Sequence, residues 1–166
     1  NTVKAIERYE EENSVTVLPS GLWLDPSGIL GASVKGLLPD GRGIIDVRCL
    51  YKYKNVSDIR EIVALNDPNF YLEESESGEL VLKKSHRVYS KIQGALCFSG
   101  RSYCDTITWT QDITHVTRVE LDPDWQTNLV VLRQFYVDKL FPKLCDKWGY
   151  DNVIKDLRTL APRSEG

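Results

Sequence analysis

The chain has 166 residues, of which 42% are hydrophobic and 27% charged, and its formal net charge is −3. This composition is typical of a globular domain and excludes a disordered chain, a collagen-like rod, a coiled coil and a general binder of polyanions. No apolar run approaches the ~18 residues of a membrane-spanning helix, and the first residues lack the apolar core of a signal peptide.

The first half of the chain predicts one helix followed by strands. Helical spacing over residues 2–12 places Val3, Ile6 and Tyr9 on one buried face. Four β-rich runs follow, and a Pro-Asp-Gly turn joins the last two as a hairpin: 14–18, 21–24, 29–38 and 43–51.

The second half adds helices and a second hairpin. The predicted elements are a helix over 57–65 capped by Ser57, an exposed loop over 66–78, a strand over 80–82, a helix over 85–100, a hairpin of 103–110 with 114–121, and a helix over 124–144 that Pro142 bends or ends. The last helix carries an apolar stripe of Leu129, Leu132, Phe135, Tyr136 and Leu140. We therefore expect one α/β (α+β) domain over residues 1–160 and a frayed tail over 161–166.

The cysteines and histidines do not predict a metal site. The four cysteines are widely spaced without a C-x-x-C pair, so we expect small buried residues of a reducing compartment: Cys49, Cys97, Cys104 and Cys145. Neither His86 nor His115 has a partner at zinc-ligand spacing, and both are expected to be ordinary surface or half-buried residues. The chain is expected to be intracellular, either nuclear or cytoplasmic.

An acid and a base interrupt the apolar strand over 43–51. Asp46 and Arg48 are two residues apart and therefore project from the same face of a strand. Taken alone, they indicate an ion pair on a half-exposed sheet face, with Lys35 of the preceding strand near them.

The two strands of this hairpin resemble a known family. Residues 31–38 are similar to the pattern G-A-S-P-D-G-L-V, and residues 43–51 to G-L-L-E-I-K-C-P-Y, of the YqaJ-type viral recombinases. These are lambda-exonuclease-like members of the PD-(D/E)XK nuclease superfamily. Further matches follow in the same order along the chain: 4–10, 21–24, 89–100, 101–105, 124–125 and 135–142. The resemblance implies a restriction-endonuclease-like fold, with a central mixed sheet flanked by helices.

In that family, carboxylates hold Mg²⁺, the metal activates water, and a strand lysine orients or deprotonates that water. The aligned residues here depart from the pattern. Thr2 and Lys35 stand where the family has acids, Asp46 stands for the glutamate and Arg48 for the lysine. Lys91 and Ala95 align with the helix glutamines, which leaves Gln93. These vestigial positions retain one metal-binding carboxylate, Asp46.

The leading hypothesis is a catalytically inactive nuclease-like domain without a cofactor or a small-molecule substrate. It would act as a protein-interaction or scaffold module, with self-association suggested by the ring-forming exonucleases, or as a DNA-binding module. The candidate DNA-binding cations are Lys35, Arg48, Lys52, Lys54, Lys83, Lys84, Arg87 and Lys91.

The alternative is an active, Mg²⁺-dependent DNA exonuclease with a rearranged site. Asp46 would then bind the metal, and Asp25, Asp40 or Asp105 would have to supply the missing carboxylates. We expect Asp25 and Asp40 to be turn caps or solvated loop residues instead, and Asp105 to be structural.

Overall fold

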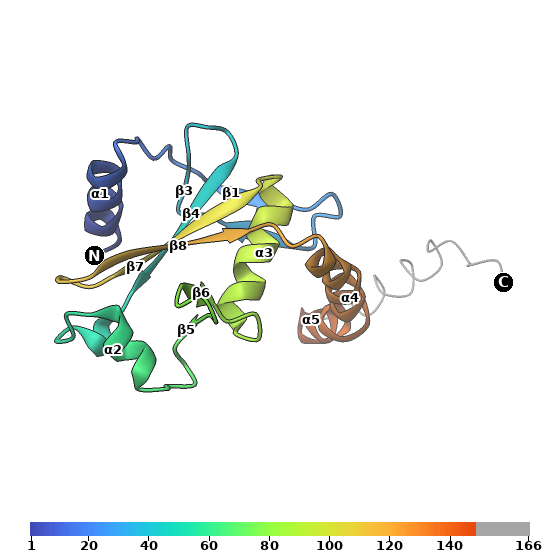
Figure 1. Cartoon of the computed structure of the whole chain (residues 1–166). Helices are drawn as coiled ribbons and strands as arrows, with labels where there is room; N and C mark the ends of the chain where they lie inside the picture. Colours follow the sequence, from blue (N-terminus) through green and yellow to red (C-terminus); the bar gives the residue numbers. More distant parts are fainter. Residues whose placement is uncertain (149–166) are drawn as a thin grey trace. The chain divides into compact units, whose positions relative to one another are not determined.

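The computed structural model describes residues 1–148, which belong to two compact units, one of residues 1–126 and one that begins at residue 127. The first unit has a four-stranded mixed sheet flanked by helices (Figure 1), and this confirms the predicted fold class. The single domain over 1–160 stays a prediction, and the tail over 161–166 lies outside the described residues.

The central sheet has the strand order β3-β4-β7-β8. β4 (Gly43–Cys49) and β7 (Tyr103–Trp109) are parallel and end together, with Cys49 beside Trp109. β3 (Gly36–Leu37) pairs antiparallel with β4, and β8 (Thr114–Glu120) pairs antiparallel with β7. Both predicted hairpins are therefore confirmed, although the first strand of the first one is shorter than expected.

The strand predicted over 29–38 is divided in two. β2 (Gly31–Ser33) pairs with β1 (Leu22–Leu24) in a separate two-stranded sheet, and only β3 continues beside β4. Lys35 lies in the exposed link between them, and its backbone N–H donates to the carbonyl oxygen of Ile45 at 3.2 Å. Lys35 therefore belongs to neither strand, and the alternation of side chains between the two faces of the sheet does not fix the direction of its side chain.

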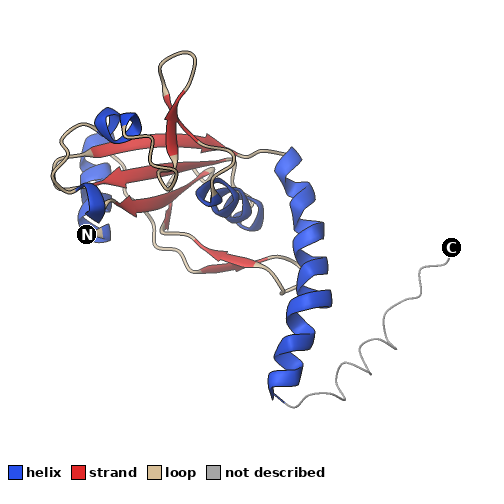
Figure 2. Cartoon of the chain, turned by 90° about the horizontal axis from the view of Figure 1, so that it is seen from below, coloured by secondary structure: helices blue, strands red, loops and turns tan. Residues whose placement is uncertain are grey.

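Alternate residues of the parallel strands face opposite sides of the sheet. On one side, Ile45 and Ile107 pack with Ala5 and Tyr9 of α1 (Thr2–Asn13). On the other side, the larger core packs against α3 (Arg87–Ser99), including Ile44, Cys104, Ile92 and Leu96. The two helices thus cover opposite faces of the sheet (Figure 1, Figure 2).

The helix boundaries are close to those predicted, but two details are wrong. Val3 is 66% exposed, because Ala5 and Tyr9, four residues apart, define the buried stripe of α1. α2 (Ile59–Ala64) is capped by Asp58, not Ser57, since the Asp58 carboxylate accepts from the Arg60 N–H.

The loop predicted over 66–78 is partly strand and core. β5 (Leu72–Glu74) pairs with β6 (Leu80–Leu82), and Phe70 and Tyr71 are buried. The apolar residues 70–72 favour burial in the core, and residues 75–79 form the turn of this small hairpin.

The second unit is a helical segment in which the type of helix changes along the chain. A 3₁₀ turn, η2 (Asp124–Thr127), leads into it, and its elements are α4 (Asn128–Phe135), the π-helical η3 (Tyr136–Leu140) and α5 (Phe141–Trp148). The option that Pro142 ends the helix is wrong, because Pro142 lies in the first turn of α5, where its missing N–H is tolerated. The predicted apolar stripe is not buried, and Phe135 is 59% exposed.

All four cysteines are free. Cys104 and Cys145 are buried and Cys97 is partly buried, but Cys49 is exposed, so its predicted burial is wrong. Cys49 ends β4, where the sheet gives way to a short 3₁₀ turn, η1 (Tyr51–Tyr53), and this end of the strand is not covered. None of the helices within residues 1–148 is both long and apolar enough to cross a membrane.

Candidate functional site

Asp46 lies in the middle of β4, and its side chain is 11% exposed. It projects from the α3 side of the sheet, with Ile44 and Arg48 on the same face. A carboxylate in such a position is costly unless charged or polar partners surround it.

Two cations provide those partners. Arg48 Nε lies 2.5 Å from one Asp46 oxygen, and Lys91 Nζ of α3 lies 3.4 Å from the other. The ion pair predicted from the strand alternation is therefore present. The second cation, however, comes from the helix and not from the neighbouring strand.

Lys35 does not take the place expected for it. It is exposed, and none of the ion pairs within residues 1–148 includes it. The break between β2 and β3 removes Lys35 from the strand face, whereas α3 lies against that face and brings Lys91 to Asp46. The one signal for this was the family resemblance, which aligns Lys91 with a helix glutamine of the nuclease pattern.

The hollow beside Asp46 is very small. Its lining includes Asp46, Lys91, Ala95 and Cys104, and its volume is about 10 Å³. That volume is at the lower limit for a single water molecule. Burial raises the pKa of the Cys104 thiol, so this side chain is a neutral neighbour of the ion pairs.

A second layer of polar groups lies next to Arg48. The Tyr71 hydroxyl and Thr108 Oγ1 form a buried hydrogen bond of 2.7 Å, and burial raises the pKa of Tyr71 above its ordinary value. Arg48 Nη2 is buried and has no hydrogen-bond partner within the described residues. The guanidinium is therefore fixed through Nε, by its contact with Asp46.

The donor set at this site does not fit Mg²⁺. The ion prefers several hard oxygen ligands, whereas Asp46 contributes the one carboxylate here and already contacts two cations. No group of three or more His, Cys, Asp or Glu side chains within residues 1–148 is arranged to hold a metal. Arg48 also remains protonated in proteins, so it cannot take the role of a base.

The other acids of the rearranged-site alternative have different partners. Asp105 lies on the α1 side of the sheet, where it pairs with Arg118 and accepts from Tyr9. Asp40 accepts from the Tyr103 hydroxyl and from turn N–H groups, and that hydroxyl is the main reason why its pKa is lowered. Asp25 is buried in a turn and accepts from the Leu30 N–H and the Ser27 hydroxyl.

Two further residues that align with site positions of the family, Thr2 and Gln93, do not take part in the ion pairs around Asp46. Thr2 is the first residue of α1, which packs on the face opposite Asp46. Gln93 is fully buried, donates to the Glu120 carbonyl at 2.8 Å, and accepts from the Asp122 N–H at 2.8 Å. Gln93 therefore ties α3 to the end of β8, whereas Asp46, Arg48 and Lys91 form the charged cluster.

The candidate DNA-binding cations are divided by their contacts. Four of the eight contact acids: Arg48 and Lys91 with Asp46, Lys52 with Asp67, and Lys84 at 3.8 Å from Asp122. Lys35, Lys54 and Arg87 take part in no ion pair within residues 1–148, and Lys83 donates to the Phe70 carbonyl.

Comparison with known proteins supports the fold. No protein-family model matches the sequence, and no curated protein matches it. A crystal structure of LHK-Exo in complex with dAMP matches with a TM-score of 0.63 and 20% identity, over 90% of this chain and 70% of that one. A crystal structure of the alkaline exonuclease LHK-Exo from Laribacter hongkongensis matches with a TM-score of 0.57 and 22% identity, over 96% of this chain and 72% of that one.

The chain has a lambda-exonuclease-like nuclease fold. The expected likeness to that group of nucleases is thus confirmed at the level of the fold.

Proposed function

We propose that this chain is a nuclease-fold domain that has lost metal-dependent DNA cleavage and acts as a binding module. The observation that carries the proposal is the contact of the Asp46 carboxylate with both Arg48 and Lys91. The positions that supply acids and a lysine base in YqaJ-type nucleases would then be vestigial.

Electrostatics favours this conclusion. An ammonium about 4 Å from a divalent cation is repelled by roughly 8 kcal/mol at an effective dielectric constant near 20. Lys91 is held beside Asp46 and therefore disfavours a metal where the carboxylate would bind it. Its side chain is 53% exposed, so part of this repulsion is screened by solvent, but the lysine still adds no ligand.

A protein partner or a second copy is the binding role that the structure favours. The second unit exposes large apolar side chains over its described residues: Val130, Val131, Leu132, Phe135, Val137, Leu140 and Leu144. Many exposed apolar side chains on one segment are typical of protein interaction surfaces. The scaffold role therefore rests on this helical segment.

DNA binding is the second candidate. A crystal structure of the similar fold holds dAMP, and Arg48 and Lys91 bring two cations to the cluster around Asp46, which favours phosphate. Because four of the eight candidate cations already contact acids, the charge left for phosphates is reduced. We therefore place this role second.

Cleavage and binding assays separate these roles. Labelled single- and double-stranded DNA is incubated with the protein and Mg²⁺ or Mn²⁺, with Asp46→Ala as the control. We expect no cleavage by either protein. Cleavage by the native chain that Asp46→Ala abolishes would instead establish the active exonuclease. Metal-independent DNA binding that falls steeply with salt would favour the second candidate.

The protein role is tested by measuring mass in solution and by capture of partners. Phe135→Glu places a charge among the exposed apolar residues, and Phe135→Leu, which keeps an apolar side chain at the same position, is the matched control. We expect Phe135→Glu to abolish self-association or partner capture and the control to retain it. Equal behaviour of the two variants would contradict the assignment of this surface.

A further inference from the structure

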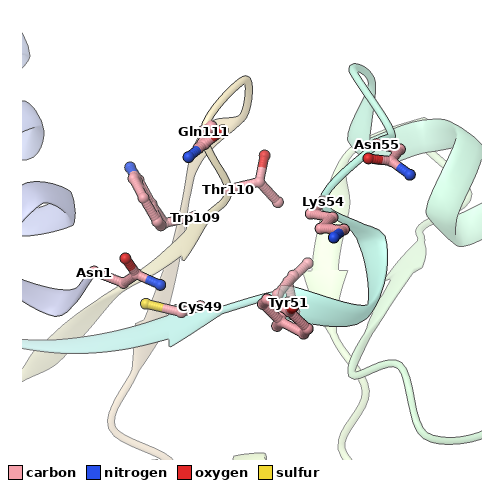
Figure 3. A pocket seen from close by; sticks show the side chains of 9 residues that line it. Asn1, Cys49, Tyr51, Lys54, Asn55, Trp109, Thr110 and Gln111 are labelled. Atoms are coloured by element: carbon pink, nitrogen blue, oxygen red, sulfur yellow. The ribbon is translucent and has the colours of Figure 1, made fainter.

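A larger cavity lies at the ends of β4 and β7, away from the charged cluster (Figure 3). Its volume is about 410 Å³, within the range of roughly 300–1,000 Å³ found for small-molecule sites. Its lining includes Cys49, Tyr51, Lys54, Asn55, Trp109 and Gln111.

The topology of the sheet forms this cavity. β4 and β7 are parallel and end at the same edge, where the Leu50 N–H donates to the Trp109 carbonyl at 2.9 Å. The chain then leaves β4 through η1 and leaves β7 through a turn, and these two segments provide opposite walls (Figure 3). Ligands of open α/β sheets commonly bind beyond the carboxyl ends of the strands.

The walls combine aromatic rings with amide groups. Tyr51 is 76% exposed, and Trp109, which also lines the cavity, is 9% exposed. The amides of Asn55 and Gln111 offer both donors and acceptors. Rings together with amides suit a flat heterocycle, which stacks on aromatic side chains and forms hydrogen bonds through its edge.

The charge of the lining selects among such ligands. Within the described part of the chain, the lining contains one charged side chain, Lys54, and no carboxylate. Lys54 Nζ lies 5.2 Å from the centre of the Tyr51 ring, so the cation stands beside the aromatic surface. A heterocycle that carries a negative group therefore fits better than a neutral or cationic one.

We propose that this cavity binds a nucleotide unit, with its base against Tyr51 and Trp109 and its phosphate on Lys54. The nucleotide is either a free mononucleotide or one residue of a single-stranded nucleic acid, since both present the same base and phosphate. The site goes beyond the proposed function and beyond the sequence-based expectation of no small-molecule ligand. Cys49 faces the α1 side of the sheet and Asp46 the α3 side, so the two sites are separate.

Cys49 supplies a reporter within the cavity. Its thiol is exposed, whereas Cys104 and Cys145 are buried, and Cys97 is partly buried with its pKa raised by that burial. The rate of alkylation of each cysteine by iodoacetamide is followed by mass spectrometry, without ligand, with AMP, and with a single-stranded oligothymidylate. We expect saturating ligand to slow the alkylation of Cys49 at least threefold and to leave Cys97 unchanged.

Variants assign the effect to the lining. Lys54→Gln removes the phosphate contact and is expected to weaken protection about tenfold, the loss of one charge-assisted hydrogen bond. Tyr51→Leu is expected to weaken it as well. Lys52→Gln is the matched control, because Lys52 contacts Asp67 and does not line the cavity.

The outcomes decide both the site and the source of the nucleotide. Protection by AMP supports a free mononucleotide, and protection by the oligonucleotide alone supports a single-stranded nucleic acid. Absence of protection by both, or protection that Lys54→Gln and Tyr51→Leu leave intact, would overturn the proposal. Asp46→Ala is expected to keep the protection, so failure of this site is distinguishable from failure of the proposed function.

Discussion

Arg48 Nε donates to the Asp46 carboxylate at 2.5 Å, and the two side chains come from alternate positions on one face of β4. Lys91 approaches the second oxygen of the same carboxylate at 3.4 Å. In a metal-dependent nuclease the corresponding acid would face other acids, which repel it until the metal binds. Here the charge of Asp46 is balanced by neighbouring side chains.

Removal of Asp46 should therefore destabilise the protein. In Asp46→Ala, the partly buried Arg48 loses its partner, and we expect the free energy of unfolding to fall by about 2–3 kcal/mol. Urea denaturation measures this change, and Asp46→Asn, which keeps the size of the side chain, should show a similar loss. A raised stability in both variants would indicate an acid repelled by its surroundings and would contradict the balanced cluster.

Restoring the family pattern should create a metal site. The combined variant Lys35→Asp, Asp46→Glu, Arg48→Lys and Lys91→Gln restores the residues of the family pattern: it adds a carboxylate at position 35, returns the strand lysine at position 48 and removes the ammonium of Lys91 from the acid at position 46. We expect Mg²⁺ to raise its melting temperature, because a ligand at about ten times its Kd stabilises the folded state by roughly 1.4 kcal/mol. The native chain should show no such shift.

The matched control carries Asp46→Ala in place of Asp46→Glu, with the other three substitutions unchanged. A folded combined variant, verified by circular dichroism, whose melting temperature does not respond to Mg²⁺ would contradict the assignment of these positions to a metal site. A shift in the control as large as that in the variant would show that Mg²⁺ binds elsewhere.

Local signals were sufficient for much of the fold. The turn over residues 39–43 predicted the first hairpin because Gly41 adopts a φ of +71°, which glycine reaches without strain. The end of α3 was predicted from Gly100, which has a φ of +64° at the helix C-cap. Such features depend on a few consecutive residues and are visible in the sequence.

Contacts between distant segments could not be read in the same way. Strand alternation predicted the pair of Asp46 with Arg48, but Lys91 reaches Asp46 from a helix 45 residues further along the chain. The exposure of Cys49 depends equally on distant segments, because it follows from the common end of β4 and β7. Both facts are set by tertiary packing, and no local pattern encodes them.

Asp105 is expected to hold α1 and β8 to the sheet. It is 3% exposed, accepts from the Tyr9 hydroxyl at 2.7 Å, and pairs with Arg118 through contacts of 2.8 and 2.9 Å. Asp105→Ala should lower the free energy of unfolding by about 2–3 kcal/mol, since it removes charge-assisted hydrogen bonds and leaves the Tyr9 hydroxyl without its acceptor. Tyr9→Phe removes one hydrogen bond and should cost about 1 kcal/mol.

Chemical denaturation of Asp105→Ala and Tyr9→Phe tests whether the first variant loses more stability than the second. Arg118→Ala is a useful third variant, because it would leave the buried Asp105 carboxylate with the Tyr9 hydroxyl as its remaining side-chain partner. We expect its loss to approach that of Asp105→Ala. Equal, small losses for all three variants would show that the network contributes little to stability.

The stability of α3 should depend on pH through His86. His86 caps this helix, as its Nδ1 accepts from the Val88 N–H at 3.2 Å, and protonation of Nδ1 would remove the acceptor. Burial lowers the pKa of His86 below its ordinary value of 6.5. As the pH falls, the unfolded chain therefore takes up this proton before the folded one, and the stabilisation present above pH 6.5 is lost toward the lowered pKa.

His86→Asn tests this dependence, because asparagine keeps a capping oxygen and does not titrate. We expect the urea midpoint of the native chain to fall between about pH 7.5 and about pH 5.5, and that of His86→Asn to fall less. Burial also lowers the pKa of His115, so the remaining decrease should be reduced by adding His115→Gln. An identical decrease in the native chain and in His86→Asn would show that the cap does not titrate in this range.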